Sequence, residues 1–286
     1  MKQWQWLIVA ATFFIWGNAA KAQERIQFRS LESSATVLDG YLYPSIGAGR
    51  HPAVVFLHGC SGMFDRSTGL ISRLERDWAS VLNGDGYSVL MVDSFRPRSI
   101  DQTCAPATYN PAVVAARPKD AYGALYYMQN QSFVRGDRIA LIGWSAGGGT
   151  VLRTIPQQSG GRPASLSQGD FRAAVALYPA LCSDQREAAS WTSNIPLLVL
   201  FGAADVWTPL APCQNFIAGA VARGSRIELH AYPGAYHAFD APDRPLRRLP
   251  QYTTTAGVVP IVGTDLAARR DAFAQVQAFL RRYLGD

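Results

Sequence analysis

Charged side chains, histidine and cysteine are all scarce in this sequence. Only 17% of the 286 residues are charged and 48% are apolar, a balance that excludes an intrinsically disordered chain. The 25 glycines and 17 prolines follow no period, and we find no repeating unit of about 20 to 50 residues. Collagen-like, proline-rich, solenoid and propeller proteins are therefore excluded. The composition predicts a folded globular protein.

A basic surface that would suit nucleic acid is also missing. The formal net charge is +6, and it drops by two if residues 1–22 are removed, because Lys2 and Lys21 lie there. Nearly all the remaining basic residues are arginines, scattered in pairs such as Arg247-Arg248 with no interleaved aromatic side chains. We therefore expect these scattered arginines to lie on an ordinary solvated surface, and we expect no nucleic-acid binding.

Residues 1–22 have the pattern of an export signal. Lys2 gives a positive start, residues 7–16 form an apolar run, and Ala20-Lys21-Ala22 has the small-x-small pattern of a signal-peptidase site. The apolar run is about half of the roughly 20 residues that a membrane span needs. We therefore predict cleavage after Ala22, export to the periplasm or out of the cell, and no stable membrane anchor.

An exported chain meets an oxidising compartment, so its cysteines are expected to form two disulfides. The order of the four suggests the pairs Cys60–Cys104 and Cys182–Cys213, although three pairings are open. None of them has CxxC spacing, and no histidine is placed to complete a metal site with them. We therefore expect no zinc or other metal centre.

Short β-branched runs alternate with amphipathic stretches along most of the chain. This alternation predicts an α/β fold, in which helices cover both faces of a mostly parallel central sheet. No linker-like composition divides residues 23–286, so we predict a single domain after the signal peptide. The expected strands are 26–31, 36–43, 53–57, 87–92, 138–142, 173–178, 196–201 and 226–231; the expected helices are 70–82, 117–130, 209–222 and 266–283; long loops are expected at 94–116, 156–170 and 240–264.

The pentapeptide Gly143-Trp-Ser145-Ala-Gly147 lies between an expected strand and a helical stretch. Strand, tight turn and helix are the setting of a nucleophile elbow, where glycines let the backbone turn sharply and expose the serine hydroxyl. The helix N-terminus also favours negative charge there. We predict that Ser145 is a catalytic nucleophile. The alternative is a glycine-rich helix start that the serine merely caps.

A serine nucleophile needs a base and a carboxylate that orients this base. The base is predicted to be His237, because it follows the late strand 226–231; the alternative is an ordinary loop histidine. In α/β-hydrolases the carboxylate lies between the serine and the histidine in the sequence. Asp205, shortly after the strand 196–201, fits that order best, while its rival Asp184 follows a strand that comes too early. Three other aspartates are not favoured, because they close a strand or lie too near the histidine: Asp93, Asp240 and Asp243.

Acyl transfer also needs donors for the negative oxygen that develops in the transition state. We predict that these are the backbone N–H of Ala146 and that of Cys60, in the turn 58–62. His58 in this turn is expected to be structural. Cys60 as the nucleophile is an alternative that lacks the elbow and requires a reduced thiol. Four aromatic residues are expected either to wall the substrate pocket or to lie in the core: Phe64, Trp144, Trp207 and Phe239.

Several segments now occur in a distinctive order: His58-Gly-Cys-Ser-Gly62, 84–95, 120–125, Gly143-Trp-Ser-Ala-Gly-Gly148, Asp205 and 232–237. Together they resemble the dienelactone hydrolase family of α/β-hydrolases, over about residues 53–284. The resemblance implies a cofactor-free hydrolase of small-molecule esters or lactones, with Ser145, Asp205 and His237 as its triad. The namesake enzymes have a cysteine where Ser145 stands and an acidic residue where Gly59 stands.

Other functions remain open at this point. A hydrolase fold that binds a ligand without turnover is one alternative, although it has no use for an ordered triad. A peptidase or an acyltransferase with the same triad is another. Arg96 either reaches the pocket to meet an anionic substrate or is paired and structural.

Overall fold

The computed structural model describes residues 23–180, 182 and 189–285. The predicted signal peptide, residues 1–22, and the alternative carboxylate Asp184 lie outside these described residues.

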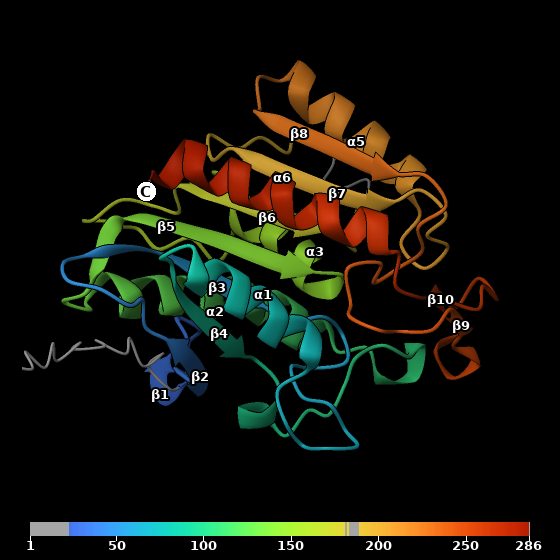
Figure 1. Ribbon diagram of the computed structural model, residues 1–286, viewed down its shortest axis with the longest axis horizontal. Coiled ribbons are helices and arrows are strands. Elements are labelled where there is room, and N and C mark those ends of the chain that lie inside the picture. The colour runs from blue at the N-terminus through green and yellow to red at the C-terminus, as the bar shows by residue number, and fades with distance from the viewer. Residues whose placement is uncertain (1–22, 181, 183–188, 286) are drawn as a thin grey trace, which may run out of the picture.

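Eight strands form one mixed sheet at the centre of the structure (Figure 1): β1 (Glu24–Arg29), β2 (Val37–Tyr43), β3 (His51–Leu57), β4 (Ser88–Asp93), β5 (Val134–Trp144), β6 (Ala173–Leu177), β7 (Leu197–Gly202) and β8 (Ile227–Tyr232). Their order across the sheet is β1-β2-β4-β3-β5-β6-β7-β8. β2 pairs antiparallel with β1 and β4, and all the pairs from β4 to β8 are parallel. The predicted mostly parallel α/β sheet is therefore confirmed.

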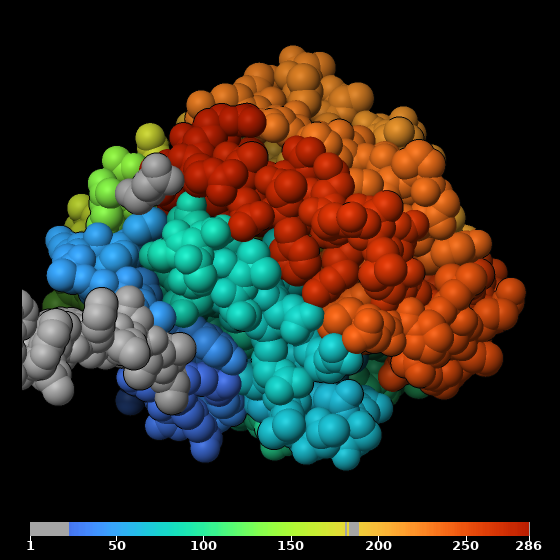
Figure 2. All heavy atoms as spheres, in the orientation of Figure 1, coloured from blue at the N-terminus to red at the C-terminus, as the bar shows by residue number. Residues whose placement is uncertain are grey.

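Helices cover both faces of this sheet: α1 (Arg73–Gly84), α2 (Pro111–Gln129), α3 (Ala146–Thr154), α5 (Leu210–Ala222) and α6 (Leu266–Leu284). α1 and α6 lie on the face turned to the viewer in Figure 1, where Arg269 of α6 and Asp77 of α1 form an ion pair of 2.7 Å. α2 and α3 pack together behind the sheet, and α5 packs against β8. In Figure 2 the side chains of α6, in red, fill the space between α1 and the segments coloured orange.

The parallel strands bring the predicted site residues to one edge of the sheet. β4, β6 and β7 are buried at every position, as expected for strands with helices on both faces. Parallel strands end at the same edge, and ligands bind there in open α/β sheets. The turn 58–62 follows β3, Ser145 follows β5, Asp205 follows β7 and His237 follows β8.

α2 begins six residues earlier than the sequence predicted. Asn110 caps it, because its side-chain oxygen accepts hydrogen bonds from the backbone N–H groups of Ala112 and Val113. Pro111 then occupies the first helical position, where a missing N–H costs nothing. Residues 111–116, which were expected in a loop, are therefore helical.

The expected loop 240–264 contains a small sheet of its own. β9 (Arg247–Arg248) and β10 (Ile261–Val262) pair antiparallel. Val262 also forms an isolated bridge with His237, and the backbone N–H of Gly263 donates to the His237 carbonyl over 3.2 Å. The segment therefore supports the backbone that carries His237.

The two disulfides suggested by the order of the cysteines are confirmed. Cys60 is bonded to Cys104 and Cys182 to Cys213, with Cα–Cα distances of 4.9 and 4.8 Å. Within the described residues, no helix is both long and apolar enough to span a bilayer.

Candidate active site

Ser145 lies in a tight turn between β5 and α3. Its φ of +53° is in the left-handed region, which a non-glycine residue adopts only where its surroundings impose it. The packing here leaves no space for side chains on the flanking glycines. A Cβ atom on Gly147 would collide with the Leu57 carbonyl of β3, and one on Gly143 would collide with the backbone of Gly147. Both glycines are therefore needed for the turn that exposes the serine hydroxyl.

Asp205 and His237 form a buried hydrogen-bonded pair. Asp205 Oδ2 lies 2.7 Å from His237 Nδ1, and both side chains are almost fully buried. Oδ2 also accepts a hydrogen bond of 2.8 Å from the Thr208 hydroxyl, while Oδ1 accepts from the backbone N–H groups of Trp207 and Thr208 at 2.8 and 3.0 Å. Four donors therefore fix the carboxylate, which in turn holds a proton on His237 Nδ1 and leaves Nε2 free to accept one.

A cavity of about 440 Å³, here called the main cavity, is lined by both Ser145 and His237. The rings of Tyr178 and Trp207 line it too, with centroids 4.5 and 4.9 Å from that of His237. Among the described contacts Ser145 makes no hydrogen bond to His237. Such bonds are often long without substrate and shorten in the substrate complex. The main cavity therefore brings together the hydroxyl, the imidazole and space for a ligand.

A second cavity of about 240 Å³, here called the side cavity, adjoins the main one at Ser145. The two share Cys60, Cys104, Ser145 and Trp207, and Ala146 lines only the side cavity. A larger hollow of about 730 Å³ lies at the opposite edge of the sheet and contains none of the predicted site residues. We place the candidate site at the carboxyl edge, because the predicted site residues Ser145, Asp205 and His237 are there.

The turn 58–62 packs directly against the serine. A Cβ atom on Gly59 would lie 3.7 Å from Ser145 Cβ, an ordinary van der Waals contact. Within the described chain, the backbone N–H groups of Cys60 and Ala146 donate to no other group. Both residues line the side cavity together with Ser145. The two N–H groups are thus available to an oxygen bound beside the serine.

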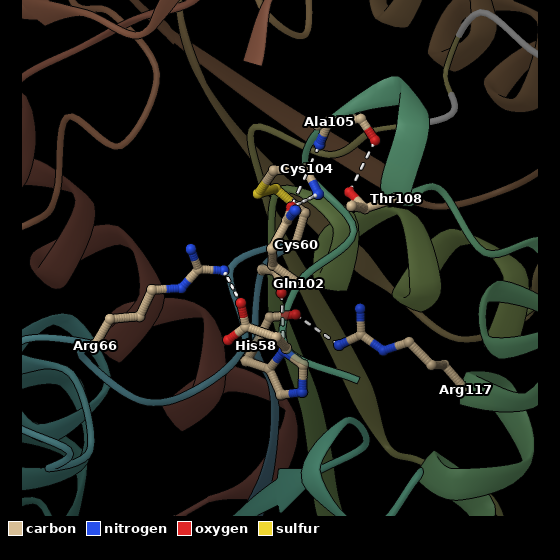
Figure 3. Close-up of a disulfide and its surroundings, with 10 residues drawn as sticks. His58, Cys60, Arg66, Gln102, Cys104, Ala105, Thr108 and Arg117 are labelled. Atoms are coloured by element: carbon tan, nitrogen blue, oxygen red, sulfur yellow. Dashed lines mark hydrogen bonds and ion pairs between the residues drawn. A yellow bond between two sulfur atoms is a disulfide. The ribbon is translucent and has the colours of Figure 1, made fainter. Parts of the chain in front are cut away.

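A disulfide and an arginine hold this turn in place (Figure 3). Cys60 is bonded to Cys104, and its carbonyl accepts a hydrogen bond of 2.8 Å from the backbone N–H of Thr103. Arg117 of α2 is buried and donates to the His58 carbonyl over 2.6 Å. Burial lowers the pKa of Arg117 to about 10, at which the guanidinium still carries its charge at neutral pH.

His58 lies beneath the turn, outside both cavities. Its Nδ1 donates to the Gly59 carbonyl over 2.8 Å, and its Nε2 accepts from the backbone N–H of Ser94 over 3.3 Å. Burial, with the charge of Arg117 in addition, lowers the pKa of His58 well below its usual value. The imidazole is therefore neutral, and its two hydrogen bonds connect the turn to the end of β4.

Removal of the Cys60–Cys104 disulfide is expected to impair catalysis as well as stability. The Cys60→Ala/Cys104→Ala variant keeps the backbone N–H of residue 60 but frees the turn that presents it. We expect kcat/KM for ester hydrolysis to fall by about 10- to 100-fold, since a misplaced oxyanion donor loses much of its effect. Enzyme kinetics at 25 °C on folded protein provide the measurement.

The Cys182→Ala/Cys213→Ala variant is the matched control. Each disulfide closes a loop of similar length, 44 and 31 residues, so both variants should lose about 3–4 kcal/mol of stability and show a lower Tm. Only the first should lose activity. Equal kcat/KM in the two variants would contradict the role given to the first disulfide.

The aromatic residues predicted for the pocket divide between wall and core. Phe64 and Trp207 line the main cavity and are partly exposed. Trp144 reaches the cavity wall but is almost fully buried. Phe239 is in the core: it is fully buried, and its ring packs against Tyr178 and Tyr232, which fits the core alternative and not a wall position.

Arg96 does not line the main cavity. Its guanidinium carbon lies 3.2 Å from the ring centroid of Phe64, and the residue lines, with Asp93, a depression that adjoins the main cavity at Phe64. Asp93 Oδ1 accepts hydrogen bonds from the backbone N–H groups of Phe95 and Arg96, which fits the structural role expected for it.

Asp240 and Tyr178 support the site without having been predicted. Asp240 Oδ2 accepts hydrogen bonds of 2.8 and 2.9 Å from the indole N–H groups of Trp78 and Trp144, and Oδ1 accepts one of 2.7 Å from the Tyr178 hydroxyl. Burial raises the pKa of Asp240, while these donors act against that rise. The network fixes the ring of Tyr178 against His237. Its sequence signal was weak, because Asp240 is only three residues from His237.

Glu75 is a buried acid in the wall of the main cavity. It lies in the first turn of α1, is 3% exposed, and accepts a hydrogen bond from the Ser72 hydroxyl. Burial raises the pKa of Glu75 to about 8, while its own backbone N–H and the charge of Arg244 oppose the rise. Its carboxyl group is therefore mostly protonated at neutral pH.

This raised pKa predicts a pH-dependent effect of Glu75→Gln on stability. The unfolded chain releases this proton near pH 4.5, where a glutamate ordinarily titrates, whereas the folded chain keeps it until about pH 8. Between these values the folded state binds more protons, so the carboxyl lowers the free energy of unfolding as pH rises. Relative to wild type, the Tm of Glu75→Gln should rise by several degrees from pH 5 to pH 8.

Thermal melts of both proteins across this range provide the measurement. The other buried carboxylates are common to both proteins, so their titration cancels in the difference. A Tm difference that stays constant from pH 5 to pH 8 would contradict the raised pKa.

In the part of the chain that the structure describes, no three histidine, cysteine, aspartate or glutamate residues lie together as metal ligands would. The predicted serine site is therefore the feature to compare with known proteins.

Comparison with known proteins gives one family. The model of the dienelactone hydrolase family matches residues 38–284. No curated protein matches the chain.

Solved structures supply similar folds. A dienelactone hydrolase-like promiscuous phosphotriesterase, P91, from metagenomic libraries aligns with a TM-score of 0.68 and 18% identity, covering 93% of this chain and 100% of its own. Esterase 2 of Thermogutta terrifontis, phosphorylated by paraoxon, aligns with a TM-score of 0.66 and 18% identity, covering 94% and 97%. Dipeptidyl peptidase 4 of Porphyromonas gingivalis aligns with a TM-score of 0.62 and 16% identity over 93% of this chain but 36% of its own. At these identities the similarity shows the fold.

Proposed function

Because this chain belongs to the dienelactone hydrolase family, we propose that it is a serine hydrolase that cleaves carboxylic esters or lactones through an acyl-enzyme on Ser145. His237 is the general base and Asp205 orients it. The backbone N–H groups of Cys60 and Ala146 stabilise the oxyanion.

A single observation carries this proposal: a strained, partly exposed serine and a histidine held by a carboxylate line one cavity. The Asp205–His237 distance of 2.7 Å and the four donors to Asp205 support a fixed imidazole tautomer. A protein that only binds a ligand has no need of this tautomer or of a serine at φ +53°.

In the first half of the proposed cycle, His237 Nε2 takes the proton of the Ser145 hydroxyl as Oγ attacks the ester carbonyl. The carbonyl oxygen becomes negative and accepts hydrogen bonds from the Cys60 and Ala146 N–H groups. The bond from carbon to the alcohol oxygen then breaks. The proton on His237 passes to that oxygen, so the alcohol leaves neutral and an acyl ester remains on Ser145.

In the second half, a water molecule takes the place of the alcohol. His237 removes a proton from this water, whose oxygen attacks the acyl carbon. The bond to Ser145 Oγ breaks, and the proton returns to the serine. One ester and one water thus give one acid and one alcohol, and the enzyme is regenerated without a cofactor.

We also propose that the mature enzyme is exported, with residues 1–22 as its signal peptide and residues 23–286 as a single domain. The two disulfides support this, because such bonds persist in oxidising compartments and are rare in the cytosol. Because Cys60 is bonded to Cys104, it offers no thiol for the alternative nucleophile.

The proposal is tested by offering a panel of p-nitrophenyl esters to the oxidised mature protein. We expect turnover of at least the short-chain esters, and covalent labelling by a fluorophosphonate probe. The Thermogutta esterase in the comparison is phosphorylated by paraoxon, which motivates a phosphorus probe. Correctly folded protein that neither turns over any ester nor reacts with the probe would support ligand binding without turnover instead.

A further inference from the structure

The two cavities that meet at Ser145 are suited to different parts of the ester. His237 lines the main cavity, whereas Ala146 lines the side cavity. The leaving oxygen must come within reach of His237, which protonates it. The alcohol part of the ester therefore lies in the main cavity. The acyl part then extends past the Cys60 and Ala146 N–H groups into the side cavity.

The side cavity suits a small acyl group. At about 240 Å³ it is little more than half the size of the main cavity. Val113, Val114 and Ala180 give it apolar walls. Arg117 also lines it: one of its N–H groups donates to the His58 carbonyl, while its Nε is buried and has no hydrogen-bond partner among the described residues. The size of the space and these apolar walls suit a short acyl chain.

The main cavity is larger than the side cavity and has more polar walls. Its walls carry several polar side chains, among them Ser61, Ser72, Glu75 and Gln251. Next to them, Trp207 and Tyr252 are stacked with centroids 5.7 Å apart and planes at 15°, and both are partly exposed. Aromatic faces beside many donors and acceptors suit a ring that has apolar C–H faces and polar hydroxyl edges.

Glu75 is the polar group in this wall that the catalytic scheme leaves unused. It does not close a capping box with Ser72, because the backbone N–H of Ser72 already donates to the Met63 carbonyl over 2.9 Å. Only the Ser72 hydroxyl and the backbone N–H of Glu75 itself interact with this carboxyl group as donors among the described residues, so it keeps further capacity for hydrogen bonds. The carboxyl group is therefore available to a ligand at a wall that is otherwise buried.

We propose that the substrate is a short-chain acyl ester of a hydroxyl-rich alcohol, such as a sugar or another polyol, and that Glu75 binds a hydroxyl of this alcohol in the main cavity. The proposal rests on the proposed function, because it assigns the two halves of the ester cleaved at Ser145. Glu75 is a positioning residue. In its protonated form it both donates to and accepts from a hydroxyl, and its burial makes an unpaired state costly.

Two acetate esters that differ only in their alcohol test this assignment: methyl 6-O-acetyl-glucopyranoside and cyclohexylmethyl acetate. We expect wild-type kcat/KM to be at least about tenfold higher for the sugar ester, since a site built to bind hydroxyls rejects an analogue that lacks them. In Glu75→Leu the ratio of the two kcat/KM values should fall by about tenfold. Glu75→Gln keeps donor and acceptor and should restore most of the ratio.

The side cavity is tested separately with Val114→Trp, which fills it. This variant should lower kcat/KM for butanoate esters by about tenfold more than for acetate esters of the same alcohol. If it instead discriminates between alcohols and not between acyl chains, the assignment of the two halves is reversed and the proposal fails.

Two further outcomes would contradict two different proposals, the substrate assignment and the proposed function. A wild-type ratio at or below one, or a ratio unchanged in Glu75→Leu, contradicts the proposal even though esters are cleaved, and the wild-type measurement needs no variant to fold. No turnover of either ester together with no fluorophosphonate labelling contradicts the proposed function itself.

Discussion

Ser145→Ala is expected to abolish ester hydrolysis while leaving a folded protein. Removal of the nucleophile leaves only the oxyanion donors and the binding groups, and kcat should fall by about 10⁴- to 10⁶-fold. Ser145 makes no side-chain hydrogen bond within the described residues, so its loss breaks no structural contact. Turnover of p-nitrophenyl acetate by the purified variant is the measurement.

Two controls separate chemistry from folding in this experiment. The Tm of Ser145→Ala should lie within a few degrees of the wild-type value, because the change removes one exposed oxygen. Activity of the wild type should also be insensitive to iodoacetamide, since the structure contains no free cysteine among its described residues. Substantial turnover surviving in Ser145→Ala would mean that another residue is the nucleophile.

Asp205→Asn is expected to cause the second largest loss, about 10³- to 10⁴-fold in kcat. Oδ1 of Asp205 accepts two backbone N–H bonds, so the amide oxygen of asparagine must take that place. Its NH₂ group is then directed at His237 Nδ1. Two N–H groups cannot face each other, so the imidazole would carry its proton on Nε2, where it cannot accept the serine proton. Steady-state kinetics on the variant provide the test.

Asp243→Asn is the matched control for this change. Asp243 is also an aspartate of the late loops, but it is exposed and pairs at the surface with Arg73 over 2.9 Å. Such exposed pairs contribute little to stability. Its substitution should leave kcat within about twofold of wild type. A similar loss in both variants, or no loss in Asp205→Asn, would contradict the role proposed for Asp205.

The sheet and the placement of Ser145, Asp205 and His237 at one of its edges could be predicted because each of these residues follows a strand with a clear apolar run. The carboxyl ends of parallel strands lie at one edge of the sheet, so residues that follow these strands are brought close together. The elbow was readable for a local reason: Gly143 and Gly147 are required by backbone contacts with β3 and with each other. The cysteine pairing followed from order along the chain.

Other features depend on contacts that the sequence does not display. The early start of α2 is marked by the Asn110 cap and by Pro111 at the first helical position, and the helix then continues through Pro118. Phe239 resembled a pocket residue because it neighbours His237, yet the turn after β8 directs it into the core. The roles of Thr208 and Glu75 become visible only from the hydroxyl bond to Asp205 and from the walls of the main cavity.

The most direct test of the serine mechanism is to map the site of fluorophosphonate attachment by mass spectrometry of the oxidised protein. The probe should modify one residue, Ser145, at a stoichiometry near one, and labelling should be lost in both Ser145→Ala and His237→Ala. An adduct on any other residue, or labelling of Ser145 that persists at the wild-type rate without His237, would contradict the mechanism.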